Sequence, residues 1–123
     1  MNQKEIRKNK LLIISLIIVL IVTLTPGNGK IAGNYLDKVA HFIIFFFLSI
    51  NICYKFQKNE KLIEAIFWGI ILGLTTEVIQ QFIPGRNMDI YDGIADTLGI
   101  IAGYYFYRSK NLKIDEMLMK FGA

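Results

Sequence analysis

Carboxylate, amide and imidazole side chains gather in two short blocks of a chain that is otherwise mostly apolar. The first block contains Asp37 and His41, and the second runs from Glu77 to Asp96. Carboxylates beside an imidazole can exchange protons, hold a divalent cation or orient the polar groups of a ligand. We expect one polar site formed by Asp37, His41, Glu77, Gln80, Gln81, Arg86, Asp89, Asp92 and Asp96.

The second block lies between two apolar segments, where charges are costly. Glu77 stands about five residues, or ~7.5 Å, inside the end of its expected helix. A lone carboxylate at that depth in a membrane costs on the order of 2–3 kcal/mol. We therefore expect Glu77 to be paired with Arg86 or His41, or to carry a proton. Asp89 is expected to be a solvated loop carboxylate.

The composition is that of an integral membrane protein. Of the 123 residues, 54% are hydrophobic, and the mean hydropathy is +0.43. The charged residues, 20% of the chain, cluster between long apolar runs. The net charge of +4 comes from such clusters and not from a basic stripe on a polar domain, so no nucleic-acid partner is expected. The single cysteine, Cys53, excludes an intrachain disulfide and a multi-cysteine metal site.

Four apolar segments predict an all-α fold, with four transmembrane helices in a compact bundle. The expected spans are about 11–27, 37–54, 65–82 and 90–107, after a polar N-terminus at 1–10. A basic start before an apolar run also fits a signal peptide. No good small-residue cleavage site follows it, so we expect the first segment to be a membrane helix.

The distribution of Lys and Arg predicts the orientation of these spans. Eleven of the 14 Lys and Arg residues lie in the N-terminus, the connector 55–64 and the tail 108–123. The positive-inside rule therefore places both termini in the cytoplasm. The tail is expected to be a short amphipathic helix on the membrane surface. Its apolar stripe consists of Ile114, Met117, Leu118 and Phe121.

Small residues on the third and fourth segments predict close helix packing. Each segment carries two glycines four residues apart, Gly69 and Gly73 on the third and Gly99 and Gly103 on the fourth. This spacing lets helix backbones approach closely in membranes. We expect the two glycine faces to pack together through Gly73 and Gly99. That packing would bring Glu77 and Asp96 to the same interface.

The same blocks resemble those of VanZ-like membrane proteins, a family named after an accessory teicoplanin-resistance protein. The first matching block is Asp37-Lys38-Val39-Ala40-His41-Phe42, followed by Phe46 and Leu48. The second block consists of Glu77-Val78-Ile79-Gln80-Gln81-Phe82, then Pro84, Gly85, Arg86, Asp89, Asp92, Gly99 and Gly103. Together they cover the chain from about 35 to 105. Asp96 departs from the pattern, because family members often carry Asn there.

The resemblance implies a multi-pass protein of the bacterial cell membrane, linked through its namesake to the cell envelope and to glycopeptide resistance. We expect a binding or accessory protein more than an enzyme. Its outward-facing polar pocket would bind a lipid headgroup or a cell-wall precursor, and the lipid bilayer is its other partner. The oligomeric state is left open.

Two other functions are compatible with the same residues. In an intramembrane enzyme, His41 or Glu77 would act as general base and Arg86 would stabilise an anionic transition state. In a transporter, the carboxylates would pass protons or a small solute. No cofactor is expected, although a divalent metal held by His41, Glu77 and Asp92 is a weaker alternative.

Overall fold

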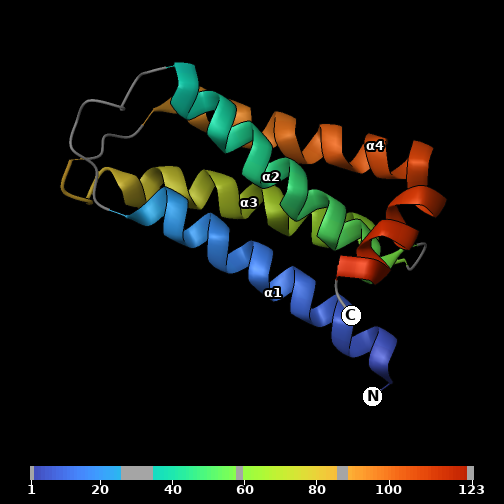
Figure 1. Cartoon of the computed structure of the whole chain (residues 1–123). Coiled ribbons are helices and arrows are strands. Elements are labelled where there is room, and N and C mark those ends of the chain that lie inside the picture. Colours follow the sequence, from blue (N-terminus) through green and yellow to red (C-terminus); the bar gives the residue numbers. More distant parts are fainter. Residues whose placement is uncertain (1, 26–34, 58–59, 86–88, 122–123) are drawn as a thin grey trace.

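The computed structural model describes residues 2–25, 35–57, 60–85 and 89–121, and within these ranges every element is a helix. The helices are α1 (Gln3–Leu24), α2 (Tyr35–Phe56), α3 (Leu62–Gln80) and α4 (Ile90–Phe121) (Figure 1). The predicted all-α fold with four main helices is therefore confirmed.

The helix boundaries follow from local capping. The Asn2 side chain accepts the backbone N–H of Glu5 at 2.8 Å, so α1 starts well before its apolar run. At the start of α4, the Asp89 side chain accepts the backbone N–H of Tyr91 at 2.9 Å. After α3, Gly85 takes a positive φ of 78°, which only glycine adopts without strain.

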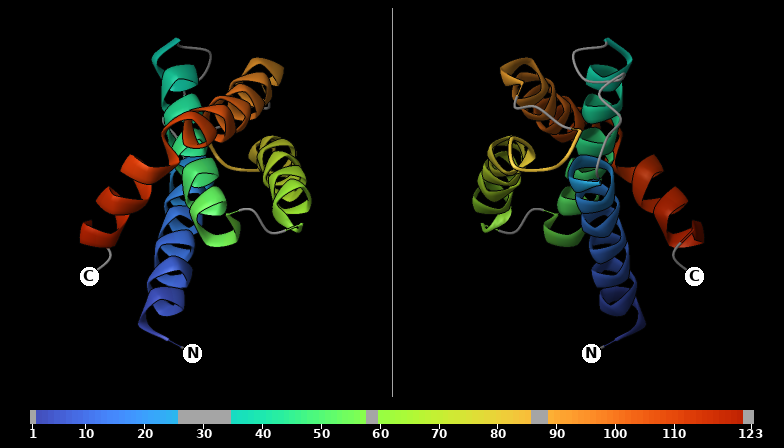
Figure 2. Two further views of the ribbon diagram at one scale, coloured as in Figure 1. Left: turned by 90° about the vertical axis from the view of Figure 1, so that its right-hand side faces the viewer. Right: turned by 90° about the vertical axis from the view of Figure 1, so that its left-hand side faces the viewer.

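The C-terminal part of α4 turns back toward the bundle. Lys110 has non-helical backbone angles, φ −127° and ψ 22°, and the helix changes direction there (Figure 2). Beyond this kink, Ile114 is buried and packs with Tyr54 and Tyr107. Residues 111–121 are thus helical, and part of their apolar stripe covers the protein core. Met117 of the same stripe is half exposed.

The helix α2 lies at the centre of the bundle. Its most extensive interface is with α4, and α1 packs against another side of it (Figures 1 and 2). We use "acidic end" for the end where α1 and α3 finish and where α2 and α4 begin. The start of α1 and the C-terminal segment of α4 lie at the opposite end (Figure 1).

Gly99 and Gly103 pack against α2, which corrects the predicted pairing of the two glycine faces. A Cβ atom on Gly99 would lie 2.4 Å from the backbone oxygen of Phe42, and one on Gly103 would lie 2.7 Å from that of Phe46. The sequence spacing identified a face that permits close approach. It did not identify which neighbour uses that face, because the spacing of residues along one helix does not specify the helix packed against it.

The glycines of α3 do face α4, but they contact side chains of α4 and not its glycines. A Cβ on Gly73 would lie 2.9 Å from Cβ of Asp96, and one on Gly69 would lie 3.2 Å from Cδ1 of Ile100. Gly73 therefore leaves the space that Asp96 occupies.

Two helices in the described ranges are long and apolar enough to cross a membrane, judged by length and composition: Leu36–Phe56 and Leu62–Gln80. The uncharged part of α1 runs from Leu11 to Leu24, which is shorter than the roughly 20 residues of a standard span. The first turns of α4 carry Asp92 and Asp96.

The contact between α2 and α4 predicts the effect of an added methyl group. Gly99→Ala should lower stability, because its Cβ meets a backbone oxygen that cannot move aside as a flexible side chain can. Overpacking of this kind typically costs about 1–3 kcal/mol. Gly93→Ala is the matched control on the same helix, since the nearest atom to its Cβ would be Cδ2 of Leu74 at 3.5 Å.

Thermal unfolding in detergent micelles measures the difference. We expect a lower midpoint for Gly99→Ala and an unchanged or higher midpoint for Gly93→Ala, because alanine also favours the helix. Equal midpoints for the two variants would show that α2 and α4 do not approach as described.

Candidate functional site

Four carboxylates surround the ring of His41 at the acidic end. Asp37 and His41 come from α2, Glu77 from α3, and Asp92 and Asp96 from α4. We call these five residues the His41 cluster. His41 is fully buried. Among the four carboxylates, the side chain of Asp37 is the most exposed, at 11%, and the other three are at most 6% exposed.

Helical spacing and the glycine contact bring these residues together. Asp37 and His41 are four residues apart on α2, and Asp92 and Asp96 are four apart on α4, so each pair shares a helix face. His41 immediately precedes Phe42, the residue that Gly99 contacts. The close approach of the two backbones therefore sets the two faces against each other.

One edge of the His41 ring binds Asp96. Its Nδ1 lies 2.7 Å from Oδ1 of Asp96 and 3.7 Å from Oε1 of Glu77. Because a carboxylate oxygen accepts, we assign the hydrogen to Nδ1, which donates it to Asp96. This bond joins α2 to α4 inside the protein, where both groups are shielded from water.

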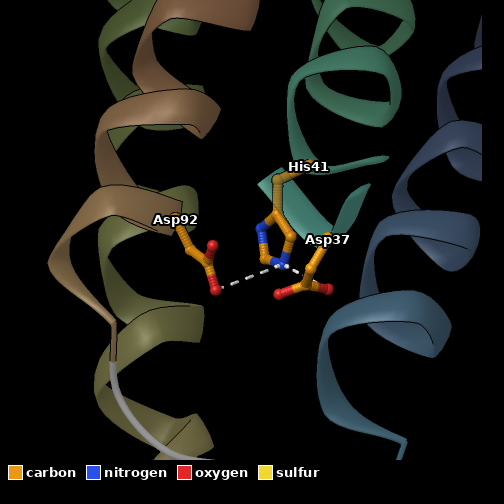
Figure 3. Close-up of side chains that lie close together, drawn as sticks. All are labelled: Asp37, His41 and Asp92. Atoms are coloured by element: carbon orange, nitrogen blue, oxygen red, sulfur yellow. Dashed lines mark ion pairs between the residues drawn. The ribbon is translucent and has the colours of Figure 1, made fainter. Parts of the chain in front are cut away.

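The other edge of the ring lies between Asp37 and Asp92 (Figure 3). Nε2 of His41 is 3.9 Å from an oxygen of each, which is too far for a hydrogen bond. This nitrogen is buried and has no hydrogen-bond partner in the described chain. The same is true of Oε1 of Glu77 and Oδ2 of Asp96. The cluster thus has unused ligand atoms on both sides of the ring.

Lys38 provides positive charge next to the cluster. It was not among the residues predicted for the site. Its Nζ lies 2.8 Å from Oδ2 of Asp89 and 3.4 Å from Oδ1 of Asp92. Asp89 is thus ion-paired, which corrects the prediction of a solvated carboxylate. The hydrogen bond from Lys38 holds the pKa of Asp89 below its usual value. The sequence feature that could have identified Lys38 as part of the site is its position next to Asp37 at the start of an apolar helix.

Glu77 finds partners inside the described chain. Its Oε2 accepts the backbone N–H of Asp89 at 3.2 Å, and its Oε1 lies near His41. His41 was one of its two predicted partners. The other, Arg86, lies outside the described residues.

Gln80 and Gln81 do not join the cluster, contrary to the prediction. The Gln80 amide donates to the backbone oxygen of Thr23 at 2.6 Å, so it ties the end of α3 to the end of α1. Gln81 follows the last residue of α3 and is exposed. Residues three apart on a helix diverge by about 60°, which is enough for Gln80 to face α1 while Glu77 faces α2.

An apolar groove of about 330 Å³ runs between α3 and α4 and reaches Glu77. Its lining consists of Leu74, Glu77, Val78, Ile90, Gly93, Ile94, Thr97 and Leu98. Glu77 is the one charged residue in this lining. The groove could not be predicted from the sequence, because its residues have the pattern of any lipid-facing helix surface.

The charges of the site do not balance within the described residues. Lys38 and a protonated His41 would still leave the surrounding carboxylates in excess. A buried excess of negative charge takes up protons or a cation.

Among the residues that the structure describes, two groups of side chains have the spacing of metal ligands. One is Asp37, His41 and Asp92, and the other is His41, Glu77 and Asp96, with ligand atoms within 4.8 Å of one another in each. The trio considered from the sequence, His41, Glu77 and Asp92, is not one of these groups. Its two carboxylates approach opposite nitrogens of the ring.

Comparisons with known proteins agree with the two sequence blocks. A model of the VanZ/LLP1 family matches residues 2–113. The uncharacterized protein C11E3.10 of Schizosaccharomyces pombe is 32% identical over 66 residues, and the match covers 51% of this chain and 41% of that protein. No solved structure matches the chain. The family match includes every residue of the His41 cluster, and this chain belongs to the VanZ/LLP1 family.

Proposed function

We propose that this protein crosses the bacterial plasma membrane with all four helices and binds the head of an envelope lipid at the His41 cluster. The observation that carries the proposal is the position of Glu77. This residue belongs to the buried polar cluster and also lines the apolar groove between α3 and α4. A lipid chain lying in the groove would bring its polar head to the cluster.

The exposed faces of α1 and α4 support four spans. On α1, Ile13, Ile17 and Ile21 are each about half exposed, and on α4 Leu98 and Ile101 are similarly exposed. Water would disfavour such continuous apolar faces, whereas lipid tails would solvate them. The acidic residues in the first turns of α4 point into the cluster and would not meet lipid.

The arrangement of charges supports cytoplasmic termini. The start of α1 and the C-terminal segment of α4 lie at the same end (Figure 1), and three basic segments hold eleven of the 14 Lys and Arg residues. At that end Glu5 lies 3.1 Å from Lys55 and 3.8 Å from Lys8. The positive-inside rule then puts the acidic end, and the His41 cluster, on the outer side.

The chemistry of the groove and cluster fits a lipid better than it fits the alternatives. The five cluster residues include no Ser, Thr or Cys, so they offer no hydroxyl or thiol nucleophile. Between His41 and the end of the bundle opposite the acidic end, the core contains Phe45, Leu48 and Ile52. These apolar side chains provide no polar route for protons or a small solute. Phospholipids and lipid-linked cell-wall precursors both combine an apolar chain with a polar head. Binding of such a precursor by the groove and the His41 cluster would connect this family member to teicoplanin resistance.

Blocking the groove tests the proposal. Ile94→Trp places a large ring among the groove residues and should remove most of the lipid that co-purifies after gentle extraction. Ile101→Trp is the matched control, because Ile101 lies on the same helix with similar exposure and does not line the groove. Native mass spectrometry measures the lipid per chain and distinguishes a phospholipid from a polyprenyl-linked precursor. Equal lipid on both variants, or none on the unmodified protein, would refute the proposal.

The orientation predicts which positions react with a membrane-impermeant thiol reagent. In a Cys53→Ala background, Gln81→Cys should label in intact cells, because Gln81 is exposed at the acidic end. Glu60→Cys, exposed between α2 and α3, should label only after permeabilisation. The reverse pattern would show that the acidic end faces the cytoplasm.

A further inference from the structure

We infer that the His41 cluster is a metal site that binds one divalent cation through Nε2 of His41 and the carboxylates of Asp37 and Asp92. The inference deepens the proposed function, on which it rests for the identity of the lipid ligand, and it concerns the same residues. The metal itself can be tested with no lipid present.

The first argument is the unused nitrogen of His41. Nε2 is fully buried and has no hydrogen-bond partner in the described chain, and it points between two carboxylates (Figure 3). The two oxygens, on Asp37 and Asp92, are each 3.9 Å from it. Ligand atoms around one ion lie roughly 3–3.5 Å apart when each bond is about 2.1 Å. Small side-chain rotations would therefore bring all three atoms onto one ion.

The second argument is the hydrogen bond on the opposite edge of the ring. A histidine that binds a metal usually donates its other N–H to a carboxylate, which fixes the tautomer and the ring orientation. Nδ1 of His41 makes this bond to Asp96 at 2.7 Å. Asp96 would thus be a positioning residue, and it leaves the lone pair of Nε2 directed at Asp37 and Asp92. The alternative trio would need Nδ1, which this bond already occupies.

The third argument is charge. The carboxylates around His41 outnumber the positive groups that the described chain places beside them, and a divalent ion would offset that excess. One imidazole with carboxylates suits Zn²⁺ or Mn²⁺. An ion there would also attract the phosphate of a lipid head, which the bare carboxylates would repel.

Metal titration of delipidated protein in detergent tests the inference. After treatment with a chelator, the protein is titrated with Mn²⁺ or Zn²⁺ by calorimetry, and we expect one ion per chain. Asp92→Asn and His41→Gln each remove a ligand and should weaken binding about 100-fold or more. Asp89→Asn is the matched control, because Asp89 is a nearby carboxylate that pairs with Lys38 and lies outside the ligand set. Its effect should stay below about fivefold.

Several results would overturn the inference. The first is that neither ion binds at up to about 1 mM. The second is that Asp89→Asn and Asp92→Asn weaken metal binding equally, and the third is that Asp92→Asn binds the metal as tightly as the unmodified protein. If the ligand variants fail to fold, electron paramagnetic resonance of Mn²⁺ on the unmodified protein decides. Nitrogen hyperfine coupling supports ligation by His41, the single histidine of the chain, and its absence contradicts it.

The two proposals fail separately. Metal binding without any co-purifying lipid would refute the lipid function and leave the metal site standing. Lipid that stays on a chain with no metal affinity would refute the metal site alone.

Discussion

Two helices can reach backbone contact only where no side chain separates them, and α4 meets α2 in this way at Gly99 and Gly103. Two residues of the site, His41 and Asp96, lie within one turn of these contacts. His41 immediately precedes Phe42, and Asp96 stands three residues before Gly99. The hydrogen bond between His41 and Asp96 therefore depends on the glycines of α4. Glu77 comes from α3, whose Gly73 packs against Asp96.

That hydrogen bond gives the two edges of one imidazole different roles. The Nδ1 edge is held by Asp96 beside Glu77, and the Nε2 edge faces Asp37 and Asp92 without a bond. In surroundings of low dielectric, a satisfied bond is strengthened and an unsatisfied polar atom is costly. An added ligand at the unsatisfied edge would therefore be stabilising.

Much of this arrangement could be predicted from the sequence. Long apolar runs indicated the four helices, and spacings of four residues placed Asp37 with His41 and Asp92 with Asp96. The glycine spacing identified the close-approach face of α4 but not its partner, because helical periodicity contains no information about which neighbour lies opposite. Residue spacing also failed for Gln80, where a divergence of about 60° directs the side chain to α1.

Other features depend on the three-dimensional arrangement of distant segments. The ion pair of Lys38 with Asp89 joins residues 51 positions apart, and the groove beside Glu77 is lined by residues of both α3 and α4. No local pattern distinguishes the groove residues Leu74 and Ile94 from other exposed apolar positions.

Asp96 holds the proton of His41 on Nδ1 and leaves Nε2 available. Nitrogen NMR of protein labelled in histidine tests it directly, since the chain has one histidine and the signal needs no assignment. We expect Nδ1 to stay protonated as the pH is raised, and any proton that the ring releases to leave from Nε2. Loss of the proton from Nδ1, with Nε2 protonated in the neutral ring, would contradict it.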